Sequence, residues 1–139
     1  MTRKILAVVF GTVVAVVLII AIEALGHAVY PMPDGLDLTN PEVLKAYVMY
    51  APIAALLLVL GAWLVAVLVG GLLACFIAKE SPLVYSAIIG GLVLMGTVIN
   101  LISIPHPLWF STTSVLAIIA TIFVTSRLGS SFVTALNAD

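Results

Sequence analysis

Charged residues divide this chain into three long uncharged runs, and this division constrains the fold more than any other feature. The runs cover residues 5–22, 46–78 and 81–126, and they are 18, 33 and 46 residues long. A helix needs about 20 mostly apolar residues to cross a bilayer. The first two runs therefore accommodate one span each, and the third accommodates two.

The third run contains a clear break between its two spans. Pro105 and Pro107 stand two residues apart, and such a pair cannot lie inside a continuous helix. We therefore predict a single domain over residues 1–139 with four spans. These spans are expected at about Ile5–Tyr30, Ala51–Ala78, Leu83–Ser103 and Leu108–Ser126.

Composition supports a membrane protein and excludes several other classes. Hydrophobic residues make up 64% of the chain and charged residues 8%, whereas about one quarter of a soluble domain is charged. Five scattered Lys and Arg residues cannot form a phosphate-binding face, so nucleic acid is not an expected partner. The apolar runs do not alternate with polar residues as barrel strands do. The predicted fold is an all-α integral membrane four-helix bundle in contact with the lipid bilayer.

Basic residues predict the orientation of the bundle. With four spans, Arg3, Lys4, Lys79 and Arg127 fall on one side of the membrane and Lys45 on the other. Because Lys and Arg concentrate in cytoplasmic loops, both termini are expected in the cytoplasm. The expected location is a bacterial-type inner membrane.

The first external loop, residues 31–50, carries its own structural signals. Residues 31–35 contain two prolines and Asp-Gly, which is typical of a turn. Thr39 and Glu42 have capping-box spacing, and proline is tolerated in the first turn of a helix. The sequence therefore predicts a short helix on the outer surface in this loop.

Small residues recur every four positions in the first three spans. Lipid is as apolar as leucine, so burial of apolar side chains does not drive helices together in a membrane. Close backbone approach at small residues drives helix association instead. We consider them either contacts within the bundle or a docking face for a membrane protein partner or a second copy. The candidates for packing or docking are Gly11, Ala66, Gly70, Ala74, Gly90 and Gly91.

Glu23 and His27 are the main candidates for chemistry. They are four residues apart on one helix and so share a face. An ionisable residue inside a span is costly and is by default a functional hypothesis. Asn100 is expected at the same membrane depth and is a possible partner. This polar site is either a structural interhelical hydrogen bond or a proton or cation site. In a simple up-and-down bundle, however, spans one and three lie diagonally.

A metal site is a further interpretation of the same region. Glu23, His27 and His106 together would supply one carboxylate and two imidazoles, a ligand set suited to zinc or copper. No other feature of the sequence requires a cofactor.

Two polar strings carry a resemblance to a known kind of protein. They are residues 23–37, EALGHAVYPMPDGLD, and residues 104–110, IPHPLWF. They resemble segments of small bacterial four-span membrane proteins of uncharacterised function. The resemblance extends over most of the chain and implies the four-span topology. It implies no activity, cofactor or catalytic residue.

Three functions remain open from the sequence. The leading hypothesis is a non-enzymatic accessory or structural subunit that docks on a larger membrane complex or self-associates. The alternative is a small transporter or a proton- or cation-handling protein that uses Glu23 and His27. The third is an outer-surface metal-binding protein or membrane enzyme.

Overall fold

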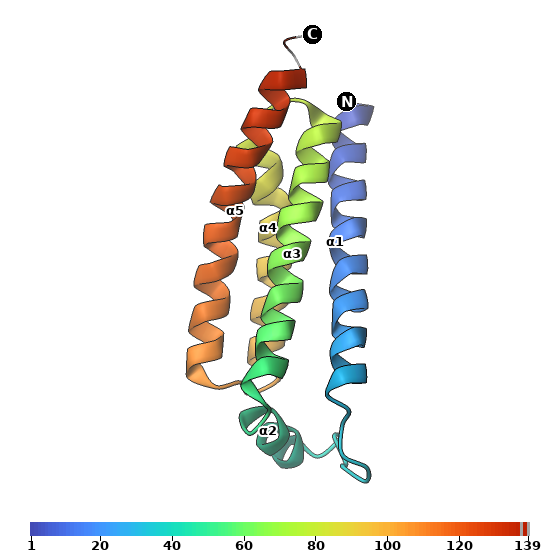
Figure 1. Ribbon diagram of the computed structural model, residues 1–139, viewed down its shortest axis with the longest axis vertical. Helices are drawn as coiled ribbons and strands as arrows, with labels where there is room; N and C mark the ends of the chain where they lie inside the picture. Colours follow the sequence, from blue (N-terminus) through green and yellow to red (C-terminus); the bar gives the residue numbers. More distant parts are fainter. Residues whose placement is uncertain (137, 139) are drawn as a thin grey trace.

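Five helices, and no strand, form the regular structure of the computed structural model, which describes residues 1–136 and 138. The helices are α1 (Thr2–Val29), α2 (Pro41–Met49), α3 (Ile53–Ala78), α4 (Pro82–Ser103) and α5 (Leu108–Leu136). The four long helices run side by side, and α2 lies at the end opposite both termini (Figure 1). Each long helix is long and apolar enough to cross a membrane. The chain is therefore a multi-pass membrane protein in contact with lipid.

The long helices coincide with the predicted spans, with one clear difference in length. The break between α4 and α5 lies at residues 104–107, where the two prolines predict it. In contrast, α5 continues beyond the predicted end at Ser126 as far as Leu136. Residues 128–136 contain no proline, so nothing stops the helix when its sequence becomes polar.

The four long helices do not form a simple ring. α3 contacts α1, α4 and α5, and α4 packs along α5. α1 packs mainly on α3 and touches α4 over a shorter length, while no contact joins α1 to α5 in the described part of the chain. In a simple up-and-down ring α1 and α5 would be neighbours. Here α1 lies at one edge of the bundle (Figure 1).

Adjacent glycines in α3 explain this arrangement. A Cβ on Gly70 would lie 2.6 Å from the carbonyl oxygen of Gly11, so α1 and α3 touch backbone to backbone there. A Cβ on Gly71 would lie 2.7 Å from Cγ2 of Thr125 on α5. Successive helix positions point about 100° apart. Gly70 and Gly71 therefore bring α1 and α5 close to different sides of α3.

Charged groups join the start of α1 to the turn between α3 and α4. Nζ of Lys4 lies 2.7 Å from Oε1 of Glu80, and this hydrogen bond lowers the pKa of the Glu80 carboxyl below its ordinary value. Nε of Arg3 donates a hydrogen bond to the carbonyl oxygen of Ile77. Within the turn, Lys79 and Ser81 adopt left-handed backbone angles, with φ of 57° and 42°.

The short helix α2 begins near its predicted start but with a different cap. The side chain of Asn40 accepts a hydrogen bond of 3.0 Å from the backbone N–H of Glu42. The hydroxyl of Thr39 instead donates to the carboxylate of Asp37, which lowers the pKa of Asp37. The prediction that Thr39 caps this helix is therefore wrong, because Asp37 already engages its hydroxyl.

Candidate functional site

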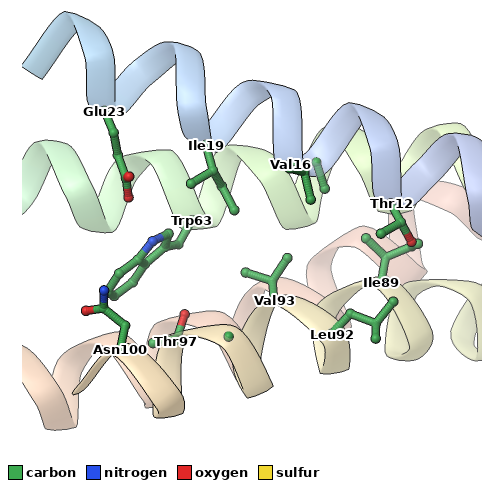
Figure 2. Close-up of a pocket in the computed structure, with 12 residues that line it drawn as sticks. Thr12, Val16, Ile19, Glu23, Trp63, Ile89, Leu92, Val93, Thr97 and Asn100 are labelled. Carbon is green, nitrogen blue, oxygen red and sulfur yellow. The ribbon is translucent and has the colours of Figure 1, made fainter. Parts of the chain in front are cut away.

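A groove of about 300 Å³ separates α1 from α4 (Figure 2) and extends from the middle of the bundle toward the end where α2 lies. Val16, Leu92 and Gly96 line it and are exposed, so the groove opens sideways between the two helices. Trp63 of α3 is its third wall. The full lining is Thr12, Ala15, Val16, Ile19 and Glu23 from α1, Trp63 from α3, and Ile89, Leu92, Val93, Gly96, Thr97 and Asn100 from α4.

The residue sizes along α1 explain where the groove lies. Ala7, Gly11 and Ala15 are the buried residues of this helix, and α4 approaches closely at that level. A Cβ on Gly11 would lie 3.0 Å from Cδ1 of Ile89. The same spacing of four then continues through Ile19 and Glu23, whose larger side chains are only half-buried. The row of small residues on α1 therefore ends where α1 and α4 separate.

Glu23 and Asn100 face one another across the end of the groove nearer α2. Figure 2 shows them extending from α1 and α4, with the indole ring of Trp63 between them in this view. Within the described part of the chain, neither side chain makes a hydrogen bond. Both polar groups therefore remain available to a third group in the groove.

Two threonine hydroxyls of the groove are buried and also lack a hydrogen-bond partner among the described residues. They are Oγ1 of Thr12 and Oγ1 of Thr97, and the whole Thr97 residue is only 2% exposed. A threonine in a helix commonly bonds back to the preceding turn, as Thr121 does to the carbonyl of Ala117 at 2.8 Å. Leaving a buried hydroxyl unpaired costs about 1–3 kcal/mol. Figure 2 shows the Thr97 hydroxyl directed into the groove.

Unpaired hydroxyls also occur outside the groove. Ser114 and Thr125 on α5 are buried without a hydrogen-bond partner among the described residues, and neither lines the groove. What distinguishes Thr12 and Thr97 from these two residues is that they line one cavity with a carboxylate and an amide.

Trp63 connects the groove to the loop between α4 and α5. Its ring centroid lies 5.7 Å from that of Phe110, which is fully buried. Phe110 in turn stacks on the ring of His106 at 5.2 Å. Nδ1 of His106 donates to the carbonyl oxygen of Ile104 at 2.6 Å. Partial burial lowers the pKa of His106 below its ordinary value, and the bond to Ile104 opposes this shift.

The residues proposed to bind a metal are not brought together. His27 is exposed on the last turn of α1 and does not line the groove. His106 belongs to the aromatic cluster with Phe110. Among the described residues, no three His, Cys, Asp or Glu side chains form a group that could hold a metal ion. Glu23, His27 and His106 therefore do not form such a group in the described structure.

The small residues singled out from the sequence have different surroundings. Gly11 and Gly70 face one another, and a Cβ on either would also approach a small side chain of the opposite helix. Gly90 lies against Ile122, whose Cγ1 would clash with an added Cβ. Gly91 is exposed, and its Cβ would meet nothing within 4 Å. Two further members, Ala66 and Ala74, are fully buried.

Sequence reasoning identified Glu23 and Asn100 but not the rest of the groove. Thr97 lies three residues before Asn100, a spacing that puts both on one helix face. Thr12 lies eleven residues before Glu23, which is close to three full turns. This recurrence of polar side chains in otherwise apolar helices is a signal that could have predicted the groove.

Comparison with known proteins finds no relative. No protein-family model, no curated protein and no solved structure matches this chain. The resemblance to bacterial four-span proteins therefore gains no support from a family match, and function has to be inferred from this chain's own residues.

Proposed function

We propose that this protein is a non-enzymatic, ligand-handling protein of a bacterial-type inner membrane. In this proposal, the groove between α1 and α4 takes up a small molecule or cation, and Glu23 is its ionisable group. The single observation that supports it most is the unpaired Glu23 carboxyl facing a groove with two unpaired hydroxyls. A transporter or a storage protein would both use such a site.

The same observation argues against a purely structural role for Glu23. A structural role requires a hydrogen bond that joins α1 to another helix, as polar residues in membrane helices commonly form. Asn100, the nearest candidate across the groove, makes no hydrogen bond with Glu23 in the described structure. An ionisable residue that lines a cavity inside a span is instead typical of a substrate or ion pathway.

We further propose that both termini face the cytoplasm and that α2 lies on the outer surface. Arg3 and Lys4 begin α1, and Arg127 lies in the same half of α5 as the C-terminus, so the positive-inside rule favours this orientation. Glu23 precedes the end of α1 by six residues, which is roughly 9 Å at 1.5 Å per residue. The polar end of the groove would then lie in the outer part of the membrane.

Cysteine labelling tests this topology. In a Cys75→Ala background, we expect Thr39→Cys to react with a membrane-impermeant maleimide from outside intact cells. Ser130→Cys should react only after the membrane is permeabilised. Labelling of both positions from the same side would contradict a four-span arrangement with cytoplasmic termini.

A matched pair of glycine substitutions tests the groove. Gly96 lines the groove and Gly91 does not, yet both are exposed on α4 and an added Cβ at either meets nothing within 4 Å. A thermal-shift screen of the purified protein would use amphiphiles that are cationic, neutral and anionic. Ligands that stabilise the wild type should also stabilise Gly91→Leu but not Gly96→Leu. Equal stabilisation of both variants would refute the groove as the binding site.

A second candidate function is a subunit that docks on a larger membrane complex or self-associates. It is favoured by Gly91, because an exposed glycine with open space around it permits the close approach of another helix. Native mass spectrometry in mild detergent would test this candidate. A stoichiometric partner or second copy that is lost in Gly91→Leu supports it, and a monomer in both proteins contradicts it.

A further inference from the structure

We infer that the ligand of the groove is a hydrophobic organic amine, bound as its ammonium cation through Glu23. This inference rests on the proposed function and specifies its ligand. The ligand consists of a positively charged nitrogen and an apolar body with the size of a ring and a short chain.

The charge of the ligand follows from the groove's own charges. Glu23 is the only residue with an ionisable side chain among the twelve that line the groove. A carboxylate that is removed from water costs free energy unless an opposite charge pairs with it. His27, the basic residue of α1 nearest to the lining, is exposed and does not line the groove, and Lys4 is paired with Glu80 at the far end of the helix. A ligand cation therefore provides the counter-charge that none of the described residues lining the groove provides.

The hydrogen-bonding groups at the polar end favour an amine with N–H donors. The carboxylate of Glu23 only accepts hydrogen bonds, whereas the side-chain amide of Asn100 and the hydroxyl of Thr97 can accept as well as donate. None of these three side chains has a hydrogen-bond partner in the described structure. A primary ammonium has three N–H donors. The unpaired, 2%-exposed Thr97 hydroxyl is an independent indication that this end of the groove is built to receive a polar group.

The remaining lining favours an apolar body on the same molecule. Ile19, Leu92 and Val93 are aliphatic, and Trp63 lies between the two polar side chains in Figure 2. Tryptophan is the strongest aromatic partner for a cation in proteins. A volume of about 300 Å³ is at the lower end of ligand pockets, which span roughly 300–1,000 Å³. The ligand is therefore small, and it enters from the lipid because the groove opens sideways.

Fluorescence of Trp63 gives a direct readout of binding. The chain has two tryptophans, so Trp109→Phe leaves Trp63 as the sole tryptophan. We would titrate this protein in dodecyl maltoside, an uncharged detergent, with three probes of one shape. These are 4-phenylbutylamine, 4-phenylbutanol and 4-phenylbutyrate, which are cationic, neutral and anionic at neutral pH.

The amine should bind saturably and at least about tenfold more tightly than the alcohol or the carboxylate, as expected when one charged hydrogen bond is added. Glu23→Gln should weaken amine binding about tenfold and change alcohol binding less than about twofold. Glu23→Asp, which keeps the charge, should retain the preference for the amine. Unchanged circular dichroism and gel-filtration elution of each variant would establish that it is folded.

The source of the ammonium is tested by adding lipid to the micelles. Phosphatidylethanolamine carries an ammonium group, whereas phosphatidylglycerol does not. Competition with 4-phenylbutylamine by the first lipid alone assigns the site to an aminolipid headgroup. If neither lipid competes with 4-phenylbutylamine, the site is assigned to a free amine. Either assignment agrees with a cationic ligand.

Three outcomes would overturn this inference, and they distinguish its failure from failure of the proposed function. In the first outcome, the amine and the alcohol bind with equal affinity, Glu23→Gln leaves this affinity unchanged, and Gly96→Leu abolishes binding. This result would show that the groove binds a ligand but that the ligand need not be a cation. Binding that is retained in Gly96→Leu as well as in Gly91→Leu refutes both proposals. Absence of saturable amine binding to the wild type also overturns the inference.

Discussion

The contact between Gly11 and Gly70 permits a quantitative prediction about the stability of the bundle. A Cβ on Gly70 would lie 2.6 Å from the carbonyl oxygen of Gly11 and 2.9 Å from Cβ of Ala15. Neither atom can rotate away, because one belongs to the backbone and the other is attached directly to it. Gly70→Ala must therefore separate α1 from α3. Overpacking of this kind costs about 1–3 kcal/mol.

Gly91→Ala is the matched control for this substitution. Both glycines lie inside helices, so each replacement by alanine gains a similar helix propensity, about 0.8–1.0 kcal/mol in water. At Gly91 the added Cβ meets nothing within 4 Å. The propensity gain therefore cancels in the comparison. Gly70→Ala should be less stable than Gly91→Ala by the overpacking cost alone, about 1–3 kcal/mol.

Unfolding by sodium dodecyl sulfate in mixed micelles, followed by far-UV circular dichroism, measures this difference. Gly11→Ala should be destabilised like Gly70→Ala, since its Cβ would lie 2.7 Å from the carbonyl oxygen of Gly70. The double variant should lose less than the sum, because one separation relieves both clashes. Stabilities of Gly70→Ala and Gly91→Ala within about 0.5 kcal/mol of each other would refute the backbone contact.

Three further predictions concern single side chains. Thr97→Val removes an unpaired buried hydroxyl, so the free energy of unfolding should stay the same or rise by up to about 1 kcal/mol; a clear loss would show that the hydroxyl has a partner. Ser81→Gly relieves a left-handed backbone with φ of 42° and should stabilise the protein by about 0.5–1 kcal/mol in the same unfolding assay. His106 has a folded-state pKa below its ordinary value of 6.5. Its contribution to stability is therefore complete above pH 6.5 and is lost as the pH falls from 6.5 through the folded-state pKa. His106→Asn should remove this part of the pH dependence, and an unchanged pH profile would contradict the assignment.

The sequence predicts the spans well because the breaks between them are local. Charges at Lys79 and Glu80, and prolines at 105 and 107, interrupt apolar runs whatever surrounds them. The end of α5 was predicted less well, since a helix can continue into polar sequence outside the apolar layer. The cap of α2 was assigned to Thr39 because its spacing to Glu42 fits, while the competing bond to Asp37 depends on the loop conformation.

The groove could be predicted only in part, because it depends on how three helices meet. Glu23 and Asn100 were identified since polar residues in apolar spans are conspicuous. Glu23 and Asn100 face the same cavity because α1 touches α4, whereas a simple ring would separate these two helices. Gly71 brings α5 onto α3 and leaves α1 at the edge. Gly129 of α5 approaches Cys75 of α3 in the same way, and no periodicity reveals which partner each glycine takes.

The neighbouring glycines of α3 also have a consequence for how the chain is made. During synthesis α1 is already present when α3 is inserted, so the Gly70 side can be covered at once by Gly11. The Gly71 side meets the backbone of Ser86 when α4 enters the membrane, and Thr125 closes it only when α5 has entered. Between these events a nascent chain exposes one small-residue face to any helix nearby. The order of translation therefore makes the α1–α3 pair the earliest stable unit and the arrival of α5 the step most open to wrong pairing.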